Sequence, residues 1–476
     1  MSRVHILYTN DLHSHFESMP AIHTLLHRLS EQLEGEGEKV FRVDLGDHMD
    51  RFSLETEGTL GRANRAVMDV TGYELVTLGN NELLTFSKEE LHDLYEKAPF
   101  EVLALNVEEV NGQRPPWIKS WEIRDVDGFR IGFLGVTIPF PQFYKLLGWQ
   151  VSDPFEVLPR VVSHLRKDVH AVVILSHLGL GNDRRLAEVV PGIDVILGSH
   201  THHLLEVPER VGNTLITGAG KFGGHVGHVM LDFDPVRQRV TGREARCLPV
   251  ANIDPDPRVK DQIDLFRREA EKRLSEAIRE LNRPLPIDWY AESPLGNFLA
   301  DGLLQWVPDS DCALVNAGQL LGGLQAGWVT RAHLHRICPH PINPVQLVLS
   351  GRQIRRILEE SLIREQQERE IRGFGFRGKK LGMMNLAGME AEVNPLKPPG
   401  QRLERVQING ALLKEDRNYR VATIDMFTFG AGYGEFKKGK EIKYFLPEFL
   451  RDVLAHHLRQ TGAPERSFRP RWRDSG

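Results

Sequence analysis

The chain has 476 residues, and a chain of this length usually divides into at least two domains because single cores stop growing at ~250–300 residues. Its 41% hydrophobic and 26% charged residues are typical of a soluble globular protein, and its formal net charge of -5 gives no overall basic field for a nucleic acid. Three widely spaced cysteines exclude a disulfide framework. No apolar run reaches the ~20 residues of a membrane span, and no apolar signal core precedes the first strand. We therefore expect a cytoplasmic protein without a membrane or nucleic-acid partner.

Short apolar runs in the first half of the chain alternate with helical patterns and end in polar turns. Helices are predicted at 20–34 and 60–71. Strands are predicted at 4–8, 40–45, 75–78, 128–136, 171–175, 194–197, 214–218 and 226–233. In open α/β sheets, the carboxyl ends of the strands share one edge, where loops direct several side chains at one place. We expect the polar turns to converge there.

Five of these turns carry side chains that bind divalent metal ions. The seven oxygen and nitrogen donors are Asp11, His13, Asp47, Asn80, His177, His200 and His202. Carboxylate, amide and imidazole groups suit Mn, Zn, Fe and similar ions. Asp11 and His13 are two residues apart, so in an extended segment both side chains face the same way. Seven donors suffice for two ions when one carboxylate bridges them and water completes the coordination, so the sequence predicts a two-metal site.

The character of the sequence changes after Pro249. Asp254-Pro255-Asp256-Pro257 is a signal for a helix start, and we predict a long charged helix at 258–281. A second charged helix is predicted at 352–370. The predicted organisation is a metal-binding domain at 1–250, a linker helix segment at 251–284 and a second domain at 285–476. The alternative is that the 258–281 helix is an ordinary surface helix of the first domain.

The motifs that carry these donors resemble those of the calcineurin-like metallophosphoesterases, and most closely the 5'-nucleotidase and UDP-sugar hydrolase branch. They are Thr9-Asn10-Asp11-Leu12-His13, Gly46-Asp47, Gly79-Asn80-x-Glu82 and Gly198-x-His200-Thr201-His202. The resemblance implies an α+β protein with a four-layer α/β/β/α first domain and a C-terminal α/β domain of the 5'-nucleotidase type. It implies one metal ion held by Asp11, His13, Asp47 and His202. It implies a second ion held by Asp47, Asn80, His177 and His200.

One motif departs from the family pattern where the family has its catalytic acid. The family has a His directly after the Asn ligand and an Asp three residues later, but here these positions are Asn81 and Leu84. An amide donates hydrogen bonds but delivers no proton near neutral pH. One hypothesis is that His48 and Arg51 take over the role. A second is that the substrate has a leaving group that needs no acid. A third is that the site binds nucleotides without turnover.

The second half of the chain resembles the family's C-terminal domain at Glu292-Ser293-Pro294-Leu295-Gly296-Asn297 and at 425–434. In the family this domain stacks the base between two aromatic rings and holds polar groups with Asn and Arg side chains. The resemblance implies substrate-binding roles for Asn316, Gly318, His340, Asp425, Phe427 and Phe429. The match weakens at specificity positions, because His340 falls where the first stacking Phe is expected. For the second ring the spacing does not choose among Met426, Phe427 and Phe429.

Together these features predict a phosphoester hydrolase that acts on nucleotides or nucleotide sugars by direct attack of a metal-bound hydroxide. The expected cofactors are two divalent ions of Mn, Zn or Fe, and Asn81, His48 and Arg51 are the candidate catalytic residues. The alternative function is a nucleotide-binding or regulatory protein that retains the metal site.

Overall fold

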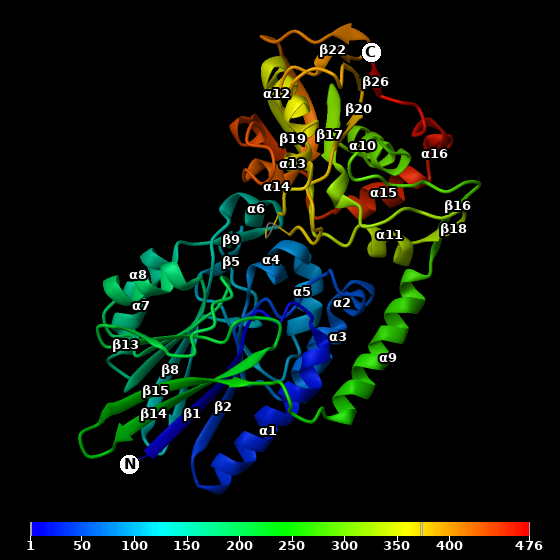
Figure 1. Ribbon diagram of the computed structural model, residues 1–476. Coiled ribbons are helices and arrows are strands. Elements are labelled where there is room, and N and C mark those ends of the chain that lie inside the picture. The colour runs from blue at the N-terminus through cyan, green and yellow to red at the C-terminus, as the bar shows by residue number, and fades with distance from the viewer. Residues whose placement is uncertain (1, 372, 374, 476) are drawn as a thin grey trace. The chain divides into compact units, whose positions relative to one another are not determined.

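The computed structural model describes residues 2–371, 373 and 375–475 of the chain (Figure 1). The chain divides into two compact units, Met1–Ala270 and Glu271–Gly476. The boundary falls inside helix α9 (Pro257–Leu274), within the segment predicted as a linker. Val259 and Ile263 of α9 are buried in a core of the first unit, and a Cβ on Gly58 would collide with Ala270. Most of α9 therefore packs as a helix of the first unit.

Two sheets form the centre of the first unit. The seven-stranded sheet has the order β15 (Arg239–Pro249), β14 (His225–Asp234), β1 (Ser2–Thr9), β2 (Lys39–Asp44), β3 (Leu75–Thr77), β4 (Glu101–Leu103) and β6 (Ile118–Lys119). The six-stranded sheet has the order β12 (Glu209–Val211), β13 (Thr214–Gly218), β11 (Val195–Gly198), β10 (Ala171–His177), β8 (Phe129–Thr137) and β7 (Trp121–Val126). The strands and helices predicted in this half occur, with ends shifted by one or two residues.

Alternation of side chains along the strands separates three apolar cores. Val4, Ile6 and Tyr8 of β1 join Val173 and Leu175 of β10 in a core between the two sheets. The opposite face of the seven-stranded sheet packs on helices α1 (Met19–Gly35), α3 (Arg62–Thr71) and α5 (Lys88–Tyr95). The opposite face of the six-stranded sheet packs on α7 (Pro154–Leu165) and α8 (Leu180–Val189). These layers confirm the predicted α/β/β/α architecture.

The second unit has one continuous hydrophobic core. Its larger sheet has the order β20 (Met384–Ala387), β17 (Cys312–Asn316), β24 (Asn418–Ile424), β19 (Pro344–Ser350) and β25 (Lys440–Tyr444). A smaller sheet has the order β23 (Ala411–Leu412), β22 (Leu403–Ile408), β21 (Met389–Val393) and β26 (Trp472–Asp474). Helices α10 (Pro294–Trp306) and α15 (Leu450–Leu458) bury apolar faces in the same core. Among the described residues, no helix combines the length and the apolar character that a bilayer crossing requires.

Two predicted helices end earlier than the sequence pattern indicates. The predicted helix at 258–281 stops at Leu274, because Ala277–Leu281 forms strand β16 and pairs with β18 (Gly327–Thr330). The predicted helix at 352–370 is two helices, α12 (Gly351–Ser361) and α13 (Arg364–Gln367). The helical periodicity of the sequence continues through both segments. Strand pairing ends the first helix, and a turn divides the second.

A relay of polar side chains, in which two histidines are buried, links β1 and β14 on the helix-covered face of the larger sheet. Arg246 Nε donates to His228 Nδ1 at 3.2 Å, and His228 Nε2 lies 2.8 Å from His5 Nδ1. His5 Nε2 in turn lies 2.6 Å from Glu38 Oε2. The arginine fixes the direction of this relay, because its donation requires a lone pair on His228 Nδ1 and leaves the proton on Nε2. His228 therefore has to be neutral.

This requirement predicts a pH dependence of stability. Burial, together with His5 and Arg246, lowers the pKa of His228 to about 3 from its ordinary 6.5. The unfolded chain then binds more protons than the folded chain between pH 3 and 6.5, so stability falls as the pH falls through this window. His228→Gln keeps both hydrogen bonds and does not titrate, so it is expected to flatten the decline by up to ~1.4 kcal/mol per pH unit.

The measurement is the thermal unfolding midpoint of both proteins between pH 4.5 and 7. The matched control is His92→Gln. The His92 side chain is 47% exposed, so this substitution is expected to leave the dependence of the midpoint on pH unchanged. Equal slopes for wild type and His228→Gln would contradict the prediction.

Candidate metal centre

Two loops that follow neighbouring parallel strands run side by side and are joined through their backbones. The Asp11 amide donates to the Gly46 carbonyl at 3.2 Å, and the His13 amide donates to the Asp47 carbonyl at 2.8 Å. The Ser14 amide donates to the His48 carbonyl at 2.9 Å. The loop after β1 and the loop after β2 therefore form one rigid unit, and they bring predicted ligands 36 residues apart in sequence into contact.

Five of the seven predicted ligands have left-handed backbone conformations. Their φ values lie between 46° and 71°, and the residues are Asp11, His13, Asp47, His200 and His202. This region is uncommon for residues other than glycine and costs energy, so it persists only where surrounding contacts enforce it. Such residues concentrate at functional sites. Their clustering here indicates a functional site in which the backbone conformation orients the side chains.

Two glycines allow the third loop, after β3, to approach the first two. A Cβ on Gly79 would lie 2.1 Å from Asp47 Oδ1, and a Cβ on Gly46 would lie 2.3 Å from the Gly79 nitrogen. Gly46 also has a φ of +84°. Glycine is therefore required at both positions, and its absence of a side chain brings the start of helix α4 (Asn80–Thr85) against Asp47.

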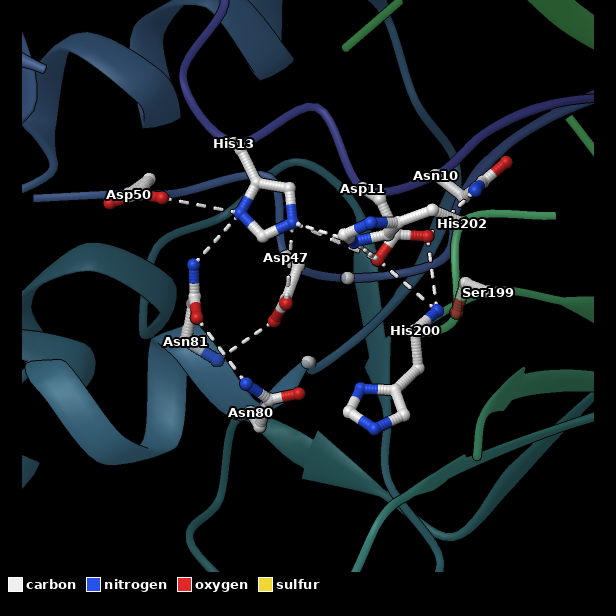
Figure 2. A network of polar contacts seen from close by, with 12 residues as sticks. Asn10, Asp11, His13, Asp47, Asp50, Asn80, Asn81, Ser199, His200 and His202 are labelled. Carbon is white, nitrogen blue, oxygen red and sulfur yellow. Dashed lines mark hydrogen bonds and ion pairs between the residues drawn. The ribbon is translucent and has the colours of Figure 1, made fainter. Parts of the chain in front are cut away.

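Side chains from three loops form the first group of ligand atoms. His13 Nε2 lies 3.7 Å from Asp47 Oδ2 and 3.2 Å from His202 Nε2. His202 Nε2 lies 3.5 Å from Asp11 Oδ1 (Figure 2). Ligand atoms of Asp11, His13 and His202 lie within 4.8 Å of one another. These spacings match a set of donors that surround a single cation.

A second group shares carboxylates with the first. Ligand atoms of Asp11, Asp47 and His177 also lie within 4.8 Å of one another, and His177 Nε2 is 3.4 Å from Asp47 Oδ1. The His177 and His200 ring centroids are 5.3 Å apart. Asn80 begins α4 beside Asp47. The structure thus brings together all the metal ligands predicted from the sequence.

Unpartnered buried atoms show that these residues fit a metal ion. His177 Nε2 and Asn80 Oδ1 are buried and make no hydrogen bond, although both groups normally bind a partner when they are buried. Asp11 and Asp47 are 0% and 2% exposed, and a buried carboxylate needs a compensating positive charge. Burial alone would lower the pKa of His177, but the nearby Asp47 carboxylate outweighs it and raises the pKa to about 10. The cluster is therefore a strong attractor of cations.

Several supporting residues were not identified from the sequence. The Glu82 carboxylate accepts from the amides of Asp47, Met49 and Gly79 at 2.9–3.0 Å, so it ties the second loop to the third. Asn10 donates to Asp11 Oδ2 at 2.7 Å and to the Gly220 carbonyl at 2.7 Å. Only their position within the motifs pointed to these supporting roles, because the contacts join loops that are far apart in sequence.

The candidate catalytic residues occupy very different surroundings. Asn81 lies at the site, where its amide nitrogen is 2.7 Å from Asp47 Oδ1 and its Nδ2 is 3.0 Å from His13 Nδ1. His48 is 2% exposed, its Nδ1 is 3.4 Å from Asn64 Nδ2, and its ring packs edge-on against Tyr73. The His48 ring is therefore enclosed by its neighbours Asn64 and Tyr73, and its role as a proton donor stays a prediction.

The Arg51 side chain is held by three neighbouring groups. Its Nε donates to Glu57 Oε2 at 2.7 Å, and its Nη1 donates to the Thr85 carbonyl at 3.0 Å. Its guanidinium also lies over the Phe86 ring, at 5.7 Å from the centroid. These contacts fix the arginine between α2 (Leu54–Thr59) and α4, and a catalytic role for Arg51 stays a prediction.

Three of the predicted substrate-binding residues of the second unit lie at the ends of two parallel strands. Asn316 ends β17 and donates to the Leu381 carbonyl, Gly318 follows it, and Asp425 directly follows β24. A Cβ on Gly318 would lie 2.1 Å from the Lys380 carbonyl oxygen. Burial raises the pKa of Asp425 to about 7. These three residues therefore lie close together at the ends of the two strands, and their substrate-binding roles stay a prediction.

The predicted stacking rings require a correction. Phe427 is 0% exposed and stacks on Phe436 with centroids 4.7 Å apart, so it belongs to the core. His340 is also 0% exposed, and Phe376 stacks on its ring at 5.2 Å. Phe429 is 40% exposed. The sequence spacing could not separate Phe427 from Phe429, because only tertiary packing determines which ring enters the core.

Comparison with known proteins agrees with this geometry. Residues 4–204 match the model of the calcineurin-like phosphoesterases, and residues 275–438 match the C-terminal domain of 5'-nucleotidases. The uncharacterized metallophosphoesterase YunD of Bacillus subtilis (strain 168) is 38% identical over 96% of this chain and 99% of its own length. The chain belongs to the calcineurin-like metallophosphoesterases with a 5'-nucleotidase C-terminal domain, and it is a metal-dependent phosphoester hydrolase.

More distant relatives extend the comparison. The 5'-nucleotidase of Rattus norvegicus is 23% identical over 75% of this chain and 71% of its own length. The structure of the Haemophilus influenzae NAD nucleotidase superposes with a TM-score of 0.71 at 17% identity and covers 100% of this chain and 99% of its own. The structure of a putative 5'-nucleotidase from Staphylococcus aureus gives a TM-score of 0.69 at 19% identity, with 99% and 100% coverage. These two structures show that the fold is shared.

Asp47 lies against ligand atoms of both groups, so we expect its substitution to empty the site of metal ions. Asp47→Asn keeps the size of the side chain and an acceptor for the Asn81 amide but removes the charge. We expect bound metal, measured by plasma mass spectrometry, to fall below one ion per chain. Activity should fall by more than the ~100-fold that loss of an outer-shell partner typically costs. Asp69→Asn is the control, because Asp69 pairs with Arg65 on α3 outside the site. Normal metal content in Asp47→Asn would refute the assignment.

Proposed function

We propose that the protein is a binuclear metallohydrolase for nucleotides or nucleotide sugars that cleaves bonds with good leaving groups, such as phosphoanhydrides. The ions would be held by Asp11, His13, Asp47 and His202, and by Asp47, Asn80, His177 and His200. Bound divalent ions of Mn, Zn or Fe would supply Lewis acidity and a nucleophile near neutral pH. The second unit would present the nucleotide, and three free cysteines support a cytoplasmic location.

The observation that carries this proposal is the surroundings of Asn81. Asn81 and Leu84 lie three residues apart on one face of α4, at the positions where the family has its His and Asp. His48 is buried behind the loops, and Arg51 is bound to Glu57 and Thr85. None of these four side chains can protonate a departing alkoxide. A phosphate or nucleoside phosphate leaves without such help, whereas a ribose alkoxide does not.

The test compares leaving groups at saturating Mn²⁺. We expect a UDP-sugar, pyrophosphate or an aryl phosphate to be hydrolysed at least ~100-fold faster than AMP, because a positioned acid contributes typically ~10²–10⁴-fold. The double variant Asn81→His with Leu84→Asp restores the pair and should raise the AMP rate more than the aryl phosphate rate. AMP as the best wild-type substrate by a wide margin would refute the proposal.

Lys221 is the candidate for a cation that binds the substrate phosphate. It lies in the loop between β13 and β14, and its Nζ is 4.4 Å from the Phe222 ring centroid. After burial and His13, the charge of Lys221 also lowers the pKa of His202. No acidic side chain pairs with it within the described part of the chain. Phe222 lies edge-on to His13, with centroids 5.8 Å apart, so this loop borders the metal centre.

Substitution of this lysine should affect substrate binding more than metal binding. We expect Lys221→Ala to raise KM about 10-fold with metal content unchanged, because an exposed ion pair with a phosphate is a modest interaction. Lys167→Ala is the control, since Lys167 is exposed at the far end of α7. Initial rates over a range of substrate concentrations measure the effect, and an unchanged KM would exclude the role.

A further inference from the structure

The four histidines of the metal centre differ in what holds their rings. His13 Nδ1, on the side of the ring away from the cluster, lies 3.3 Å from Asp50 Oδ2 (Figure 2). His177 Nδ1 instead lies 2.8 Å from the Leu45 carbonyl. The His200 ring makes aromatic contacts with Phe140 and His177. Only the His13 ring thus has a carboxylate behind it, among the part of the chain that the structure describes.

Asp50 is itself fixed on both sides. It is 2% exposed, and its Oδ1 accepts from the Phe52 amide at 2.9 Å. Its own amide donates to Ser14 Oγ at 2.7 Å. That hydroxyl also accepts a hydrogen bond from Asn64 Nδ2 at 2.9 Å and lies 2.8 Å from Thr56 Oγ1. The carboxylate is therefore held in place before any ligand binds.

The chemical consequence follows from the two nitrogens of one imidazole. A proton on Nδ1 that is donated to Asp50 leaves the lone pair on Nε2, and Nε2 faces Asp11, Asp47 and His202. A carboxylate behind a metal-binding histidine fixes the ring and increases its basicity. A backbone carbonyl fixes the ring but adds no full charge. The first group of ligands therefore has a stronger donor than the second.

Asn81 opposes this arrangement. Its Nδ2 lies 3.0 Å from His13 Nδ1 and 3.2 Å from the Met49 carbonyl. An amide donor facing Nδ1 favours a lone pair there, and that tautomer would leave a proton on Nε2, where a metal has to bind. Asp50 is the group that reverses this preference. A chain with Asn at position 81 therefore depends on the carboxylate at position 50 to prepare His13 for metal.

We propose that Asp50 is a positioning residue that fixes the metal-binding tautomer of His13, and that it makes the Asp11, His13, Asp47, His202 position the tighter of two unequal metal positions. This inference rests on the proposed binuclear site. The second position, which His200 helps to form, fills at a higher metal concentration.

The test is a titration of the metal-free full chain with Mn²⁺, in which the electron paramagnetic resonance signal of the free ion is recorded. The wild type should bind two ions with separate dissociation constants. Asp50→Asn should weaken the tighter ion by ~10–100-fold and leave the weaker one within a factor of three. His200→Gln should do the reverse. Asp69→Asn is the control and should change neither constant.

The outcomes separate the two proposals. A wild type that binds fewer than two ions would overturn the binuclear site itself. A wild type that binds two ions, together with an unchanged tighter constant in Asp50→Asn, would overturn only the role of Asp50. If Asp50→Asn lacks a cooperative thermal transition, the same titration is made on Asp50→Glu, which keeps the charge but displaces the carboxylate. Weaker binding of the tighter ion supports the proposal there, and an unchanged constant overturns it.

Discussion

The metal centre depends on the backbone hydrogen bonds that join the loop 11–14 to the loop 46–50. These bonds hold Asp11, His13 and Asp47 in left-handed conformations that isolated residues of these types would avoid. Because the loops follow adjacent parallel strands, β1 and β2, the register of the sheet sets which amides face which carbonyls. A shift of that register would separate the ligands. The chemistry of the site is therefore a consequence of sheet pairing in the first unit.

The surrounding contacts share one purpose, which is to fix side chains before a ligand arrives. Glu82 ties the second loop to the third through three amides, and Gly79 allows that third loop to touch Asp47. The Ser14 hydroxyl anchors Asp50, and Asp50 lies behind His13. Preorganisation of this kind reduces the cost of ordering ligands when the ion binds. It also explains why so many polar groups here are fully buried.

The loss of the family's acid is coupled to this local network. Asn81 occupies the acid's position but contacts His13 and Met49, so it is part of the support of a metal ligand. His48, which the sequence offers as a replacement for the acid, contacts Asn64 and packs edge-on against Tyr73. The contacts of both side chains are therefore directed at the support of the loops that carry the metal ligands.

The sequence by itself predicted seven candidate metal ligands, because strand ends, turn residues and donor spacing are local features. The resemblance of its motifs to a known family implied the four-layer fold and the position of the missing acid. Only the tertiary structure decided the surroundings of His48, Arg51, Asp50 and Phe427. Their side chains contact Tyr73, Glu57, His13 and Phe436, respectively. Residue type and spacing do not encode such partners, because the packing of the folded loops and helices selects them.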